Sequence, residues 1–480
     1  MNKNARAHDL LVNDLTEQLV VGNLAIFAGA GLSVEAGFVD WAKLLKPIAD
    51  DLNLDIGKET DLVTLAQYHC NNNQANRAKL NQLLVNQFSD DAKITENHRI
   101  LARLPIGTFW TTNYDHVIEK ALEDAKKRPD VKYTPKQLAT NKPKRDAIVY
   151  KMHGDANHPA EAVLTRDDYE RYHLKMKPFL TALSGDLVSK TFLFLGFSFT
   201  DPNLEYILSR VRVAYDKDQR QHHCILRHVK QNKDESQADF EYRVRKQELF
   251  VQELLRVGVK TTWIEEFSEI TEILRQLENK FKQRTVFISG AAHDYGKWAK
   301  EDALKFVFEL SKDISRRQYR VVSGFGLGIG SSVITGVLES LYMSGGRLDS
   351  DQLILRPFPQ QQVGTIDLKK VWSQYRQDMI QYAGIAVFLF GNKIESGNVV
   401  LSGGMREEFE IAKAQGAFVI PVGITGFMSE QLWHEVYSSF DEKAYKNGAA
   451  IRIKLEILGD ATTTLDDARK AILEIFDLLK

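Results

Sequence analysis

The stretch Phe27–Ser33, FAGAGLS, joins an apolar run to a tight turn that contains two glycines. The preceding residues, GNLAI, predict a strand over 24–28, and a helix is expected to begin beyond the turn. In parallel α/β sheets a nucleotide usually binds where a strand ends in such a turn. Glycines can adopt positive φ and let backbone N–H groups approach a phosphate. Taken alone, however, the turn is equally well explained as a structural turn without a ligand.

Apolar runs that end in polar residues recur along the first half of the chain. They are IGTFWTTNYD (106–115), AIVYKMHGD (147–155), TFLFLGFSFTDPN (191–203), HHCILRHV (222–229) and VKTTWIE (259–265). Near-continuous apolar strands between helical segments are typical of a parallel sheet that is covered on both faces. The carboxyl ends of parallel strands share one edge, so the polar residues of these runs are expected to gather there.

A second α/β series begins near residue 284. Its predicted strands are VFISG (286–290), YRVVSGFG (319–326), LILRPF (353–358), AGIAVFLFGN (383–392) and GAFVIPVG (416–423). Helical patterns at 297–317, 331–343, 370–382, 404–415 and 464–479 separate or follow them. The sequence therefore predicts an α/β fold with two Rossmann-like domains, 1–283 and 284–480. Each is expected to contain a mostly parallel sheet with helices on both faces.

Composition narrows the class of protein. The 480 residues carry 63 basic and 64 acidic side chains, a net charge of −1 that points neither to nucleic acid nor to a membrane surface. No apolar run approaches the ~18 residues of a membrane helix, and the start, MNKNARAHDLLVNDL, does not resemble a signal peptide. The two cysteines, Cys70 and Cys224, cannot form a four-cysteine zinc site. We expect a cytoplasmic protein without a metal.

Three polar residues at the predicted strand ends could carry chemistry. Asn113 and Asp115 follow one strand, and an amide with a carboxylate can fix a ribose and a carboxamide. His153 follows another strand, and an imidazole can act as a base on a ribose hydroxyl near neutral pH. Each residue alone is better explained as a turn residue, a helix cap or a structural histidine.

Taken together, AGAGLS, TTNYD, HG and GFSFTDPN resemble the motifs of the sirtuin family in order and spacing, over about residues 10–280. Sirtuins bind NAD in a Rossmann-like domain and break its nicotinamide–ribose bond. The resemblance implies catalysis by Asn113, Asp115 and His153, with His153 as the general base. It implies NAD+ binding by Ala28, Gly29, Ala30, Gly31, Ser33, Asp40, Trp41, Gly196, Ser198 and Asp201.

Two departures from sirtuin deacetylases matter. Thr112 stands where those enzymes usually carry a glutamine, and the four-cysteine zinc module that braces their peptide groove is missing. These departures favour plain hydrolysis of NAD+ to ADP-ribose and nicotinamide over protein deacylation. Asn113 would then position the attacking water, and Asp115 would lie near the developing positive charge.

The second half contains its own glycine turn, VVSGFGLGIGSS, followed by the helical segment SGGMREEFE. Backbone amides at a helix N-terminus favour an anion, although a structural turn also explains the glycines. Together these motifs resemble the SLOG family over about 284–480. The PGGxGTxxE signature of its phosphoribohydrolases lacks its GT pair here, so we expect a pocket that binds a nucleotide signal. Its candidate residues are Ser289, Gly290, Ala291, Gly326, Leu327, Arg376, Lys393, Gly404, Met405 and Glu408.

A sirtuin-like domain followed by a SLOG domain resembles the NAD-consuming effectors of the Thoeris anti-phage system. The resemblance implies that a TIR-domain partner supplies a cyclic ADP-ribose isomer, which binds the SLOG domain and activates NAD+ cleavage in a homotetramer. Two alternatives remain: a zinc-free protein deacylase or ADP-ribosyltransferase, and a non-catalytic nucleotide sensor. A dehydrogenase explains the residues least well.

Overall fold

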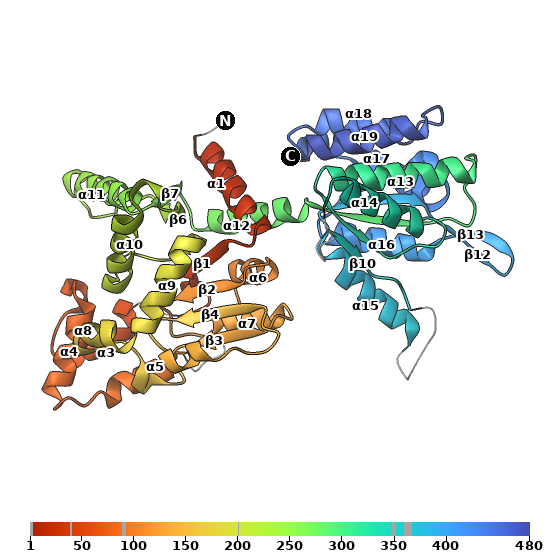
Figure 1. Cartoon of the computed structure of the whole chain (residues 1–480). Coiled ribbons are helices and arrows are strands. Elements are labelled where there is room, and N and C mark those ends of the chain that lie inside the picture. Colours follow the sequence, from red (N-terminus) through yellow and green to blue (C-terminus); the bar gives the residue numbers. More distant parts are fainter. Residues whose placement is uncertain (1–2, 39–40, 89–92, 200, 347–351, 360–366) are drawn as a thin grey trace. The chain divides into compact units, whose positions relative to one another are not determined.

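The chain forms two compact units, which divide within one helix. The structure is a computed structural model that describes residues 3–38, 41–88, 93–199, 201–346, 352–359 and 367–480. The units are Met1–Glu278 and Asn279–Lys480, and the division falls inside α12 (Ser268–Lys282). The boundary predicted at 283 directly follows the end of that helix. Each unit contains one parallel sheet flanked by helices, which confirms the predicted fold class (Figure 1).

The sheet of the first unit has seven strands in the order β3-β4-β2-β1-β5-β6-β7, and neighbouring strands are parallel throughout. The strands are β1 (Leu24–Ala28), β2 (Thr108–Thr111), β3 (Pro129–Lys132), β4 (Ala147–Lys151), β5 (Thr191–Leu195), β6 (His222–Arg227) and β7 (Val259–Ile264). Strands β2, β4 and β3 lie on one side of β1. The chain then crosses to the other side of β1, where β5, β6 and β7 follow in order. The switch point, where α/β sheets bind ligands, therefore lies between β1 and β5.

Helices bury both faces of this sheet, and every residue of β1 is buried. The helices are α1 (Lys3–Val20), α2 (Ala30–Val34), α3 (Trp41–Asp51), α4 (Leu62–Asn72), α5 (Ala78–Phe88), α6 (Glu96–Arg103), α7 (Val117–Asp124), α8 (Arg166–Lys175), α9 (Lys177–Ser189), α10 (Pro202–Tyr215), α11 (Gln237–Arg256) and α12, with a short 3-10 helix η1 (Ile56–Lys58). An aromatic cluster that includes Phe27, Trp110 and Phe194 forms one core. A second core lies among α3, α4 and α5.

The turn after β1 packs directly against the turn after β5. Gly29 donates its N–H to the carbonyl of Leu195, and Gly31 donates to the carbonyl of Gly196, both at 2.9 Å. Gly196 has φ +61°, and a Cβ added to it would lie 2.1 Å from the nitrogen of Leu32. The glycines therefore allow backbone-to-backbone contact between two loops. The N–H groups of Gly29 and Gly31 are used in this contact rather than held open for a phosphate.

The sheet of the second unit has five parallel strands in the order β10-β9-β8-β11-β14. The strands are β8 (Thr285–Ala291), β9 (Arg320–Ser323), β10 (Leu353–Leu355), β11 (Ile385–Phe390) and β14 (Phe418–Pro421). The helices are α13 (Lys300–Arg316), α14 (Gly330–Met343), α15 (Leu368–Ile380), α16 (Gly403–Ala414), α17 (Phe427–Ser439), α18 (Gly448–Ile457) and α19 (Leu465–Leu478). One large apolar core joins the sheet to these helices.

An antiparallel hairpin, β12 (Asn392–Glu395) with β13 (Asn398–Leu401), follows β11 and was not predicted. Strand β3 was not predicted either, because its sequence, PDVK, offers no apolar run. In the part of the chain that the structure describes, no helix is long and apolar enough to cross a membrane.

The contact between the glycine turns makes a testable prediction about stability. Gly196→Ala should destabilise the first unit by about 2–4 kcal/mol, because the new Cβ adds a steric clash to an unfavourable φ. Gly22→Ala is the matched control, since Gly22 has φ +71° but no atom within 4 Å of the added Cβ. Urea unfolding monitored by circular dichroism should show a clearly larger loss for Gly196→Ala. Equal losses for the two variants would show that the turns do not need this close approach.

Candidate active site

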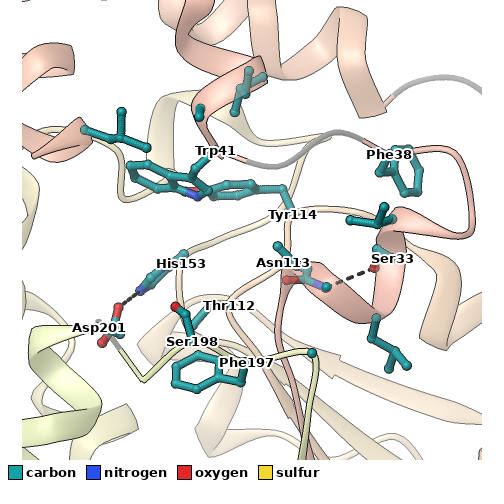
Figure 2. A pocket seen from close by; sticks show the side chains of 18 of the residues that line it. Ser33, Phe38, Trp41, Thr112, Asn113, Tyr114, His153, Phe197, Ser198 and Asp201 are labelled. Carbon is teal, nitrogen blue, oxygen red and sulfur yellow. Dashed lines mark hydrogen bonds and ion pairs between the residues drawn. The ribbon is translucent and has the colours of Figure 1, made fainter. Parts of the chain in front are cut away.

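A cavity of about 1350 Å³ opens at the carboxyl edge of the first sheet and is large for a small-molecule site. Its lining includes most of the residues predicted from the sequence (Figure 2): Ala30, Gly31, Ser33, Trp41, Asn113, Asp115, His153, Gly196, Ser198 and Asp201. Ala28 and Gly29 are not among the lining residues, although both belong to the adjoining strand end and turn. Asp40 lies outside the described residues.

Asn113 ties its own loop to the glycine turn. Its Nδ2 donates to the carbonyl of Gly29 and to Oγ of Ser33, both at 3.0 Å. Its backbone N–H donates to Oγ1 of Thr111 at 2.9 Å. Among the described residues nothing donates to Oδ1 of Asn113, and Figure 2 shows Nδ2 turned toward Ser33. The amide oxygen is therefore the atom of Asn113 that can accept a hydrogen bond from a water or a ligand.

A buried lysine that the sequence did not reveal holds the same loop. Lys151, at the end of β4, donates to the carbonyls of Tyr114 at 3.1 Å and Asp115 at 2.6 Å. Its ammonium also lies 2.7 Å from Asp155 and 3.1 Å from Glu119. Burial alone would lower the pKa of Lys151, but the two carboxylates outweigh burial and raise it. The loop that carries Asn113 is thus bound to the strand that leads to His153.

Asp115 has a structural contact of its own. Its Oδ1 accepts a hydrogen bond of 3.0 Å from the N–H of Val117, the first residue of α7. The side chain is buried and also lines the cavity. Asp115 thus braces the start of a helix, and a direct role toward the nicotinamide ribose stays a prediction.

His153 lies in a buried pocket of aromatic side chains. Its ring lies 5.5 Å from the ring of Tyr169, 6.4 Å from Tyr172 and 6.5 Å from Tyr114, measured between centroids. Burial raises the pKa of all three tyrosine hydroxyls well above the usual value, so they remain neutral. Nε2 of His153 lies 2.9 Å from Oδ2 of Asp201 (Figure 2). Among the described residues Nδ1 has no hydrogen-bond partner, so it can accept a proton from a ligand.

The cavity continues past β6 to a basic end that the sequence analysis also missed. Arg227, Lys230 and Arg243 line this end. Arg227 stacks on the ring of Phe267 at 4.3 Å, while Arg243 pairs with Glu235 at 2.9 Å. Cations at the end of a cavity of this size suit a ligand that carries phosphates. The available signal was Arg227 at the end of the strand HHCILR and Lys230 three residues later.

In the second unit an ionic cluster forms where β8 meets α15 and α16. Ser289 donates to Oε2 of Glu408 at 2.6 Å, and Nε of Arg376 lies 3.5 Å from Oε1 of the same residue. Arg376 also donates to Glu407 at 2.7 Å and lies over the ring of Phe358 at 4.9 Å. Burial raises the pKa of Glu408, although Ser289 and Arg376 oppose this effect. Glu408 is therefore the buried partner, and Glu407 lies further toward solvent.

Most of the other candidate residues of this unit gather around the same strand ends. A Cβ on Gly404 would lie 2.7 Å from Nη2 of Arg376, and a Cβ on Gly326 would lie 1.7 Å from the carbonyl of Gly290. Ala291 accepts a hydrogen bond from Gly391, against which the side chain of Met405 packs. Leu327 is 74% exposed on the glycine turn. Lys393 stands apart: it lies on the hairpin strand β12 and pairs with Glu395 at 3.3 Å.

Comparisons with known proteins agree with both halves of the chain. Residues 107–252 match the family model described as SIR2-like domain. Residues 269–479 match the model described as Sir2- and TIR-associating SLOG family. The chain is 54% identical to "NAD(+) hydrolase ThsA" of Bacillus cereus (strain MSX-D12), with 98% of each chain covered. It is 47% identical to the protein of that name from Cytobacillus dafuensis (98% and 97% covered) and 42% identical to that from Acinetobacter baumannii (strain 532279), with 98% of each covered.

The fold and the site thus define a SIR2-like domain joined to a SLOG domain. At this identity over nearly the whole length, the chain belongs to the ThsA family of NAD(+) hydrolases. The resemblances drawn from the sequence are confirmed, and so is the prediction of an NAD-hydrolysing enzyme at the level of the family. The roles of the individual site residues stay predictions.

The buried lysine generates a prediction for this site. Lys151→Met should destabilise the first unit by about 3–5 kcal/mol, because it leaves Asp155 and Glu119 buried without their cation. NAD+ cleavage should fall with it, since the carbonyls of Tyr114 and Asp115 lose their donor. Lys58→Met is the control: Lys58 is an exposed lysine whose ion pair with Asp55, at 3.8 Å, should matter little. Thermal unfolding that is unchanged in Lys151→Met would contradict this account.

Proposed function

We propose that the first unit cleaves NAD+ with water to give ADP-ribose and nicotinamide, and that a cyclic ADP-ribose isomer bound to the second unit switches this activity on. The observation that carries the proposal is the convergence of Asn113 and His153 on one cavity at the carboxyl edge of the sheet. Membership in a family of NAD(+) hydrolases supports the substrate.

Asp115, Asn113 and His153 have different roles in the proposed reaction. As the bond between ribose and nicotinamide breaks, positive charge develops on the ribose, and the buried carboxylate of Asp115 favours that charge. Oδ1 of Asn113 accepts a hydrogen bond from the attacking water and orients it toward the sugar. Nδ1 of His153 accepts a proton from a ribose hydroxyl. Water adds to the ribose carbon as nicotinamide leaves. One proton of that water returns to the ribose oxygen that lost its own, and the proton on His153 is released to solvent.

Product analysis separates hydrolysis from transfer. Purified protein incubated with NAD+, the cyclic activator and an acylated peptide should yield nicotinamide and ADP-ribose in equal amounts, with the peptide unchanged. Thr112 in place of a glutamine supports this outcome. Formation of O-acyl-ADP-ribose or of ADP-ribosylated protein would favour the deacylase or transferase alternative. NAD+ that stays constant under every condition would favour a non-catalytic sensor.

The cluster around Arg376 supports the switch. A cyclic ADP-ribose isomer carries a pyrophosphate, which competes with Glu407 and Glu408 for the guanidinium. A ligand shifts a conformational equilibrium only if it binds the two conformations with different affinity. The replacement of Glu407 and Glu408 by the pyrophosphate at Arg376 would be the source of that difference in affinity. We propose that a TIR-domain partner makes the signal, that the enzyme acts as a homotetramer, and that NAD+ depletion defends a bacterium against phage. The family description "Sir2- and TIR-associating" supports the partner.

Removing the base or the amide should abolish catalysis while leaving signal binding intact. His153→Ala should lower activated NAD+ cleavage by at least about 100-fold, since positioned proton transfer contributes that much or more. Asn113→Ala should lower it by about 100-fold as well, because the attacking water loses the group that orients it. Nicotinamide release, followed by chromatography, measures the effect. His173→Ala is the matched control, because His173 is exposed on α8 and does not line the cavity. Near-normal activity in His153→Ala would remove this residue from the mechanism.

Removing the guanidinium should uncouple the two units. Arg376→Ala should abolish activation, because the ligand loses its pyrophosphate partner, while any basal cleavage stays at the level of the unaltered protein. Titration with the cyclic isomer while nicotinamide release is recorded tests this. The control is Arg452→Ala on α18, which removes an ion pair with Glu442 at 3.4 Å that is not part of the Arg376 cluster. An activation curve unmoved in Arg376→Ala would show that the signal binds elsewhere.

A further inference from the structure

The two oxygens of the Asp201 carboxylate make different contacts. Oδ1 accepts the N–H groups of Asn203 and Leu204, both at 3.0 Å, and so caps the start of the 14-residue helix α10. Oδ2 faces the other way, 2.9 Å from Nε2 of His153 and 3.4 Å from the hydroxyl of Tyr169. One oxygen therefore fixes the carboxylate to a helix, and the other presents a negative charge to the histidine.

The groups around the imidazole make Asp201 its charged partner. Tyr172 donates its hydroxyl to the carbonyl of Met152 at 3.0 Å, and Tyr114 donates to the carbonyl of Val163 at 2.7 Å. These hydroxyls are therefore occupied, and Tyr169 shares Oδ2 of Asp201 with the histidine. Nε2 approaches Asp201 closely, although not with the alignment of a full hydrogen bond. Among these groups around the imidazole, Asp201 is the charged one, and the three tyrosine hydroxyls are neutral.

Asp201 is held as an anion at this place. Burial alone would raise its pKa, but His153 and the N–H groups of Leu204 and Asn203 outweigh burial and lower it. The N-terminus of a helix of this length also favours a negative charge. Because Asp201 is 9% exposed and both carboxylate oxygens have partners in the protein, it is poorly placed to bind NAD+ directly.

We propose that Asp201 is the positioning residue of the general base rather than a contact of the substrate. The negative charge of Oδ2, 2.9 Å from Nε2 of His153, favours the proton on Nε2, which leaves Nδ1 unprotonated and ready to accept the ribose proton. When Nδ1 takes that proton, the imidazole becomes a cation, and the neighbouring carboxylate stabilises it. The proposal rests on the role of His153 as the base in the proposed function.

Asp201→Asn tests this role without removing the helix cap. Asparagine caps helices as well as aspartate does, so α10 keeps its two hydrogen bonds and thermal unfolding should change little. The variant loses the negative charge, and its amide can donate to Nε2, which forces the proton onto Nδ1. We expect kcat for activated NAD+ cleavage to fall at least about 100-fold, with KM for NAD+ changed less than about threefold.

Two comparisons make the test decisive. Asp55→Asn is the control for an aspartate-to-asparagine change at a cap, because Asp55 caps η1 through the N–H of Gly57 at 3.0 Å and does not line the cavity. In the His153→Ala background, Asp201→Asn should have no further effect on the rate. An unchanged kcat in Asp201→Asn would overturn the proposal, as would full additivity with His153→Ala. If the unaltered protein cleaves no NAD+, the proposed function fails instead, and the two failures are thereby distinguished.

Discussion

Backbone contact between the turn after β1 and the turn after β5 is the constraint on which the first unit depends. Gly29 and Gly31 donate to the carbonyls of Leu195 and Gly196, and a side chain at Gly196 would collide with the nitrogen of Leu32. The contact closes the switch point of the sheet and makes one surface out of two loops. Asn113 then bonds to the carbonyl of Gly29 and to Ser33, so a third loop is built on the same surface.

The second unit repeats this design with different side chains. A Cβ on Gly326 or Gly328 would lie 1.7 or 1.8 Å from the carbonyls of Gly290 and Ala292, so its glycine turn also touches the neighbouring loop through backbone alone. Around this turn lie an arginine and a buried glutamate rather than an amide and a histidine. Similar glycine geometry therefore accompanies different chemistry, and the strand-end side chains set what each unit does. We propose that one turn borders NAD+ cleavage and the other borders signal binding.

Much of the fold was predictable because buried parallel strands have recognisable, uniformly apolar sequences. The run FLFL of β5 and the run IAVFLF of β11 are buried throughout and hence uniformly apolar. Strand β3 escaped prediction because an edge strand can be short and polar, as PDVK is. The convergence of Asn113, His153 and Gly196 also followed from the sequence, since the carboxyl ends of parallel strands share one edge.

The contacts between those residues were not predictable. A lysine at a strand end is normally exposed, and only the fold shows that Lys151 is buried among Asp155, Glu119 and two carbonyls. Asp201 was predicted to bind NAD+ because of its position in GFSFTDPN. Its approach to His153 depends on how α10 begins, which sequence spacing does not specify.

We propose that the two units form one enzyme that is silent until it receives a signal. Nicotinamide release by the purified, unaltered chain, measured as a cyclic ADP-ribose isomer is titrated at fixed NAD+, tests this claim most directly. The account predicts a rate near zero without the isomer and a saturable rise as it is added. The same rate of nicotinamide release at every concentration of each isomer would contradict it.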